Sequence, residues 1–153
     1  MKLLSFPDTI SSLLGGLFRL AVTVQPGRPI ASAGAIAVYV FDDGTTAAGC
    51  VCDLPLAGYL SGAMMMVPAL SVVEAVDSGE LTEDLADGLR ECLNVMAQIF
   101  NSPGGRHVTI SQIYVIPAVC PDEVVQDLIK LPRKVHFDVQ IAGYGSGAMS
   151  LLT

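Results

Sequence analysis

Basic residues are scarce in this sequence, which has eight lysines and arginines against fifteen aspartates and glutamates and a net charge of −7. Nucleic acids and anionic membrane surfaces are bound through clusters of lysine and arginine side chains. The charge therefore argues against both as partners. It does not indicate which proteins the chain binds.

Cysteine and histidine are also few, and their spacing does not fit a zinc site. Cys50, Cys52, Cys92 and Cys120 include no Cys-x-x-Cys pair, and neither histidine stands at zinc spacing. Such cysteines are typical of small buried hydrophobic residues in a reducing compartment. We therefore expect a cytoplasmic protein with no metal or cofactor of its own.

Long unbroken apolar runs are missing. The longest uncharged stretch, Leu54 to Val73, contains Pro55 and Pro68 and has no flanking basic residues. It predicts buried helices and not a membrane span. At the N-terminus, Pro7 and Asp8 cut the apolar run too early for a signal peptide.

Two patterns that carry chemistry in other proteins stand here in the wrong context. The run Gly143-x-Gly145-x-Gly147 lies between two expected strands with no helix after it, which argues against a nucleotide loop. There is no Gly-x-Ser-x-Gly elbow. His107 and His136 fall on different expected strands without a nearby nucleophile, so we interpret both as surface histidines.

The hydrophobic periodicity predicts a single α+β domain over residues 1–153, with a mostly antiparallel sheet of about six strands packed with helices. Asp42-Asp43-Gly44 is typical of a hairpin turn, and Asp53 is a candidate N-cap. We expect Met64 to Met66 to pack in the core. Both halves begin with a helix that leads into strands, which hints at a duplication. The expected helices are 8–18, 54–67, 69–76, 81–100 and 121–131, and the expected strands are 19–24, 30–41, 45–52, 106–116, 134–141 and 148–153.

The helix expected over residues 81–100 has the clearest pattern. Its apolar residues recur at spacings of three and four after a candidate N-cap at Thr82. Its polar residues recur in the same way on the other face, where they lie one above the next. This polar face consists of Asp84, Asp87, Glu91, Asn94 and Gln98. The pattern alone fits a solvated face. However, Asn94 has weak helix propensity and Val95 lies beside it, which indicates a face that meets a partner.

Asp87, Glu91, Asn94 and Pro117 together form the pattern Asp-x3-Glu-x2-Asn-x22-Pro. This pattern resembles the signature of the CheC/CheX/FliY family of chemotaxis phosphatases, in which Asp or Ser, Glu, Asn and Pro stand at the same spacings. The order of the expected elements also resembles a one-site, CheX-like member. Compared with such a member, the residues from Met64 to Ser78 look like an addition before the central helix.

The resemblance implies an α+β fold and an enzyme that hydrolyses the aspartyl phosphate of CheY-type response regulators in two-component signalling. By this resemblance, Glu91 would pair with a lysine of the regulator, and Asn94 would position the attacking water. Asp87, Val95 and Gln98 would contact the partner at the edge of the same surface, and Pro117 would be structural. The regulator's own acidic pocket would hold Mg²⁺.

Two alternatives remain at this stage. One is a non-catalytic binding module for a response regulator or a flagellar switch component, as in the middle domain of a flagellar switch protein that shares the fold without the site. The other is a structural homodimer formed through an exposed sheet edge, with the helix face merely solvated. A homodimer is also compatible with either of the first two functions.

Overall fold

The computed structural model describes residues 6–153, which form one six-stranded sheet in the order β1-β5-β6-β3-β2-β4. Every neighbouring pair of strands is antiparallel. The α+β class and the antiparallel sheet expected from the sequence are therefore confirmed. The strands are β1 (Val22–Pro26), β2 (Ala35–Phe41), β3 (Thr46–Cys52), β4 (Val108–Val115), β5 (Lys134–Ile141) and β6 (Gly145–Leu152).

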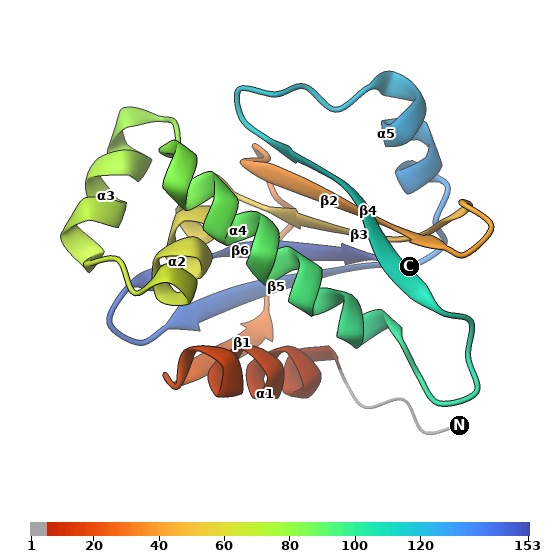
Figure 1. Ribbon diagram of the computed structural model, residues 1–153, viewed down its shortest axis with the longest axis horizontal. Coiled ribbons are helices and arrows are strands. Elements are labelled where there is room, and N and C mark those ends of the chain that lie inside the picture. The colour runs from red at the N-terminus through yellow and green to blue at the C-terminus, as the bar shows by residue number, and fades with distance from the viewer. Residues whose placement is uncertain (1–5) are drawn as a thin grey trace.

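Four of the helices lie on one side of the sheet (Figure 1): α1 (Phe6–Phe18), α2 (Leu54–Met65), α3 (Ala69–Ser78) and α4 (Glu83–Val95). In that view α4 runs diagonally across the front of the sheet. The fifth helix, α5 (Asp122–Ile129), packs on the opposite side, where Leu128 lies against Gly49 of β3. No helix among residues 6–153 has the length and apolar character that crossing a bilayer requires.

The strand order is symmetrical. It reads the same from either edge when β1 is exchanged with β4, β2 with β5, and β3 with β6. The two halves of the chain are thus arranged alike, and α1 and α4 each precede an edge strand. This arrangement agrees with the duplication suggested by the repeated order of elements. Only the second of these two helices carries a Glu-x-x-Asn motif.

The core lies between the sheet and the four helices. In β5, Phe137, Val139 and Ile141 are buried while Asp138 and Gln140 are exposed, which is the alternation of a strand with one face on the core. Cys50, Cys52 and Cys92 are buried in the same core, as expected for small hydrophobic residues. Burial raises the pKa of the Cys92 thiol well above its ordinary value, so it stays protonated.

Asp53 confirms its expected role and has a second one. Its carboxylate accepts from the backbone N–H of Leu56 at 2.9 Å and so caps α2. It also accepts from the backbone N–H of Ala148 on β6 at 3.0 Å. One side chain therefore starts the helix and attaches it to the sheet.

The last strand begins earlier than the sequence predicts. Gly145 and Gly147, expected in a turn, pair with Ile141 and Val139 of β5. A side chain at Gly147 would stand 2.5 Å from the Cβ of Leu56, so glycine here permits the close approach of α2 to the strand. The glycines are typical of a turn, but tertiary packing places them in a strand.

The prediction that Met64 to Met66 pack in the core is wrong for two of these three methionines. Met64 packs partly against the core, whereas Met65 and Met66 are exposed. Helix α2 ends at this point, because Met66 adopts a left-handed conformation with φ of 57° and its N–H bonds to the carbonyl of Gly62. The chain turns away from the core there and carries both side chains outward.

Candidate functional site

The polar face expected on the central helix is present. Asp84, Asp87, Glu91 and Asn94 are exposed along α4, and Gln98 is exposed just beyond its end. We call the surface formed by Asp87, Glu91, Asn94 and Gln98 the α4 ridge. The side chains of Glu91 and Asn94 make no hydrogen bond or ion pair with any of residues 6–153. A carboxylate and a carboxamide one helical turn apart are therefore free to contact a partner.

The other ridge positions differ in their surroundings. Asp87 forms an exposed ion pair with Arg90, with 3.1 Å between Oδ1 and Nη1, so it is engaged within its own helix. An exposed pair of this kind is worth roughly 0.3–0.5 kcal/mol and can be exchanged for a partner's charge. Val95 is only half-buried at the flank of the ridge.

The ridge rests on a tight contact between α4 and α2. The buried face of α4 includes Leu85, Gly88 and Leu89. A side chain at Gly88 would stand 2.4 Å from Cγ of Met65 and 2.6 Å from the hydroxyl of Ser61, so the two helices touch at this glycine. The Ser61 hydroxyl donates to the carbonyl of Leu85. These contacts fix the rotation of α4 and with it the direction of the ridge.

The end of the ridge that bears Asn94 is held from the sheet. The hydroxyl of Tyr39 on β2 donates to the carbonyl of Leu93 at 2.6 Å. Past this point the chain tightens into a 3₁₀ turn, η1 (Met96–Phe100), so the continuous helix predicted through residue 100 is wrong for its last part. The Tyr39 ring also packs on Phe100, with 4.8 Å between centroids.

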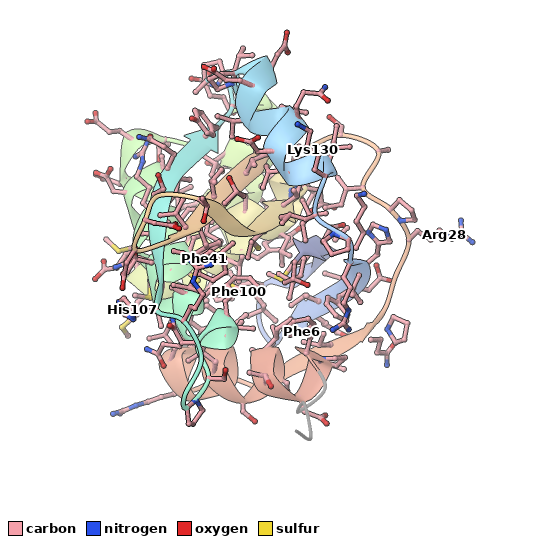
Figure 2. All side chains as sticks on the ribbon, turned by 90° about the vertical axis from the view of Figure 1, so that its right-hand side faces the viewer. Phe6, Arg28, Phe41, Phe100, His107 and Lys130 are labelled. Carbon is pink, nitrogen blue, oxygen red and sulfur yellow. The ribbon has the colours of Figure 1, made fainter. Side chains whose placement is uncertain are left out.

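Aromatic side chains support this turn from the side (Figure 2). Phe100 lies between Phe6 of α1 and Phe41 of β2 in that view, and its ring centroid is 6.5 Å from that of Phe6. Further along, the Asn101 side chain exchanges two hydrogen bonds with the backbone of Val108, at 2.8 Å each. The segment that follows Asn94 is therefore tied to both α1 and β4.

Pro117 is not part of the ridge. It follows the far end of β4, whereas Arg90 lies opposite the middle of that strand, beside Ile110 to Ile113. Its neighbour Ile116 donates its backbone N–H to the carbonyl of Gly34 at 3.0 Å. Pro117 thus stands in the connection between β4 and α5.

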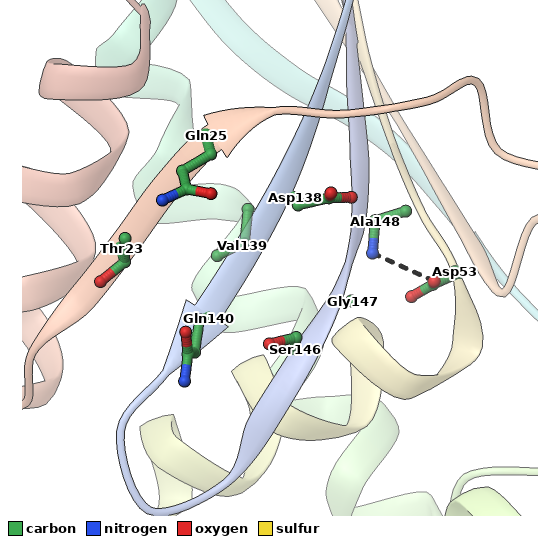
Figure 3. Close-up of a pocket in the computed structure, with 9 residues that line it drawn as sticks. All are labelled: Thr23, Gln25, Asp53, Asp138, Val139, Gln140, Ser146, Gly147 and Ala148. Atoms are coloured by element: carbon green, nitrogen blue, oxygen red, sulfur yellow. Dashed lines mark hydrogen bonds between the residues drawn. The ribbon is translucent and has the colours of Figure 1, made fainter.

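A second polar region lies on the open face of β1, β5 and β6 (Figure 3). This cavity of about 440 Å³ is lined by two carboxylates, two carboxamides and two hydroxyls. The carboxylate of Asp53 already accepts hydrogen bonds there from the backbone N–H groups of Leu56 and Ala148. No basic side chain or nucleophile–base pair lines it. The lining side chains are those of Thr23, Gln25, Asp53, Asp138, Val139, Gln140, Ser146 and Ala148, with Gly147.

His136 has a partner that sequence analysis missed. Its Nδ1 lies 2.7 Å from the hydroxyl of Ser150, directly across from it on β6. Ser150 is buried, so a substrate cannot reach its hydroxyl. The pairing of β5 with β6 would have been the only signal for this contact. Within residues 6–153 no three histidine, cysteine or carboxylate side chains gather closely enough to hold a metal ion.

Neither a protein-family model nor a curated protein sequence matches the chain. Its fold is similar to solved structures of bacterial proteins. The FliM middle domain from H. pylori has a TM-score of 0.63, with 15% identity, covering 95% of this chain and 83% of that one. FliY from Thermotoga maritima has a TM-score of 0.53, with 15% identity, covering 99% and 91%.

CheX from Borrelia burgdorferi, in a complex with CheY, BeF3 and Mg²⁺, has a TM-score of 0.52. Its identity is 13%, and the match covers 95% of this chain and 92% of that one. At such identities a likeness establishes the fold. The chain thus has the CheC/CheX/FliY-like fold, which the sequence pattern of α4 predicted.

Proposed function

We propose that this protein dephosphorylates the aspartyl phosphate of a CheY-type receiver domain. The proposal rests on the exposure of the Glu91 and Asn94 side chains and on their lack of partners among the described residues. Both side chains are exposed on one face of α4, and neither has a partner within residues 6–153. The shared fold with CheX, which was solved in a complex with CheY, supports the same partner class.

Asn94 would position the water. Its carboxamide oxygen can accept a hydrogen bond from the attacking water while its N–H₂ group donates to a phosphoryl oxygen. The water oxygen bonds to phosphorus, the bond from phosphorus to the aspartyl oxygen breaks, and inorganic phosphate and a free carboxylate result. Such a reaction needs positioning and charge stabilisation more than covalent help.

Glu91 would orient the complex. A charge-assisted hydrogen bond from its carboxylate to a lysine of the receiver would fix how α4 docks. Mg²⁺ would be held by the receiver's acidic residues, since residues 6–153 bring no group of three metal ligands together at the ridge. Asp87, Val95 and Gln98 would contact the receiver around the central pair.

The experiment is release of phosphate from a panel of phosphorylated receiver domains, with and without this protein. Asn94→Ala should lower the rate of hydrolysis by about a hundredfold while binding is retained. Glu91→Ala should instead weaken binding by about tenfold or more. Gln126→Ala is the matched control, because it removes an exposed helical carboxamide on α5, on the other side of the sheet. A wild-type protein that binds these receivers and leaves the phosphate lifetime unchanged would exclude the phosphatase.

That outcome would favour a second function, a non-catalytic binding module. The FliM middle domain has a TM-score of 0.63 and CheX one of 0.52, so the shape of the chain fits the former at least as well. The score reports the backbone and not the side chains of α4. Binding of a receiver that is insensitive to Asn94→Ala would identify this module.

We also propose that the protein is a homodimer that pairs through a sheet edge. Strands β1 and β4 are the two edges, and β4 is the longer, with eight residues against five. Analytical ultracentrifugation should show a dimer, and hydrogen exchange should show edge-strand amides that lose protection on dilution. A monomer at all concentrations would contradict the pairing.

A further inference from the structure

Four exposed apolar side chains stand along the turn from α2 into α3. They are those of Met65, Met66, Leu70 and Val73, which are 46%, 87%, 78% and 37% exposed, and we call them the methionine patch. Among residues 6–153 the other large hydrophobic side chains with comparable exposure are Val119 and Ile129. Clustered exposure of this kind marks interaction surfaces, whereas single exposed residues do not.

The patch is held by a well-ordered set of contacts beneath it. The hydroxyl of Tyr144 donates to the carbonyl of Val67 at 2.7 Å, and Val67 donates its N–H to Gly62 at 2.9 Å. On its inner face, α3 packs Val72 and Val76 against the glycines of α2. The outward direction of Leu70 and Val73 is therefore a consequence of how α3 docks.

Met66 is the most informative member of the patch. It is the C-cap of α2 and has a left-handed backbone, a position that glycine usually occupies at lower conformational cost. Here that position carries a long apolar side chain that is almost fully in solvent. Little of this side chain packs against the rest of residues 6–153, so most of its apolar surface is available to another molecule.

The surroundings of the patch are strongly acidic. Glu74 and Asp77 share the outer face of α3 with Leu70 and Val73, at steps of three and four. Met65 touches Gly88 of α4, whose neighbours one turn before and after are Asp84 and Glu91. Residues 67–95 hold seven exposed carboxylates and one basic side chain, so their net charge is −6 of the −7 of the whole chain. The seven carboxylates are Glu74, Asp77, Glu80, Glu83, Asp84, Asp87 and Glu91.

We propose that the methionine patch and its acidic border bind a basic amphipathic helical segment of a partner protein. Apolar side chains of the segment would pack on the flexible methionines, and its lysines and arginines would meet the carboxylates. A second copy of this chain would bring the same carboxylates face to face, and an anionic membrane would be repelled. This surface does not depend on hydrolysis at Asn94.

The first experiment measures binding of a labelled leucine–lysine peptide, designed as an amphipathic helix about four turns long, by fluorescence anisotropy. A peptide with glutamate in place of lysine is the matched probe. The basic peptide should bind at least about tenfold more tightly, and its affinity should fall as salt rises. Equal binding of the two peptides would overturn the proposal.

Three double variants locate the contact. Met66→Ser with Leu70→Ser should weaken binding of the basic peptide about tenfold, and Val119→Ser with Ile129→Ser, which alters exposed apolar residues elsewhere, should leave it unchanged. Glu74→Gln with Asp77→Asn should reduce the salt dependence. Peptide binding that survives the first variant would overturn the proposal. So would a dimer of the wild-type chain that Met66→Ser abolishes, because the occupant would then be a second copy.

Discussion

Tyr39 and Leu93 are joined by a hydrogen bond that spans two layers of the molecule, from the hydroxyl on β2 to the backbone carbonyl one residue before Asn94. Burial raises the pKa of Tyr39 well above its ordinary value, with the neighbouring cysteines contributing to the shift. The hydroxyl therefore keeps its proton through the physiological range and remains a donor. The position of Asn94 is thus set in part from β2, the strand beside the β4 edge of the sheet.

Tyr39→Phe removes this donor and keeps the ring against Phe100. We expect a loss of about 1–2 kcal/mol in the free energy of unfolding, measured by urea denaturation. If the proposed hydrolysis is correct, the rate constant of hydrolysis should fall and the affinity for the receiver should stay the same. Unchanged stability would show that the bond contributes nothing to the fold.

Two helical glycines should respond in opposite ways to alanine. Gly88→Ala places a methyl group against Met65 and the bonded hydroxyl of Ser61, so it should destabilise the protein by about 1–3 kcal/mol. Gly16→Ala in α1 meets nothing within 4 Å and should stabilise it by about 0.5–1 kcal/mol. Thermal unfolding of both variants gives the comparison. Equal effects would mean that α2 and α4 are not in close contact at Gly88.

Asp53→Ala should be among the more damaging surface changes. It leaves the N–H of Leu56 without its cap and the N–H of Ala148 without a partner, which together should cost about 2–3 kcal/mol. Asp138→Ala is the control, because it removes a neighbouring carboxylate of the same cavity that has no such role. Chemical denaturation should separate the two variants clearly. Similar losses would indicate that the cap is dispensable.

The cysteines should differ in reactivity. Cys120 is the one thiol of the chain that is not fully buried, so it alone should react with a disulfide reagent in the folded protein. Partial burial, and then the charge of Asp122, raise the pKa of this thiol, which lowers its thiolate fraction at any given pH. Labelling should therefore be slow near neutral pH and quicken as pH rises. Asp122→Asn should accelerate the labelling. Reaction of all four thiols in the absence of denaturant would contradict the burial of Cys50, Cys52 and Cys92 in the core.

The order of helices and strands followed from periodicity and capping residues, and β5 has the predicted bounds. These are local signals. The early end of α4 depends on a tyrosine 54 positions away in sequence, and the early start of β6 depends on packing against Leu56. Neither contact can be recognised from the residues that are nearby in the sequence. The prediction that Met65 and Met66 are buried was wrong for another reason. Hydrophobicity describes the average environment of a residue type, whereas Met66 stands where the chain reverses its direction.

Helix α4 and its polar face were predictable from the sequence because this helix is strongly amphipathic. The roles of Glu91, Asn94, Asp87, Val95 and Gln98 stay predictions, since they require a receiver. What the sequence could not supply was the support beneath them, which comes from α2 and from β2. Contacts between distant segments of that kind are decided by the whole fold.

The symmetrical strand order has a consequence for how the molecule is made. Each half of the chain contributes strands that are separated by strands of the other half, since β1 lies beside β5 and β4 beside β2. Neither half can close a sheet by itself, so β1 must wait for the last third of the chain to emerge from the ribosome. Two fragments divided near Gly79 should each be unfolded when alone and should assemble only when mixed.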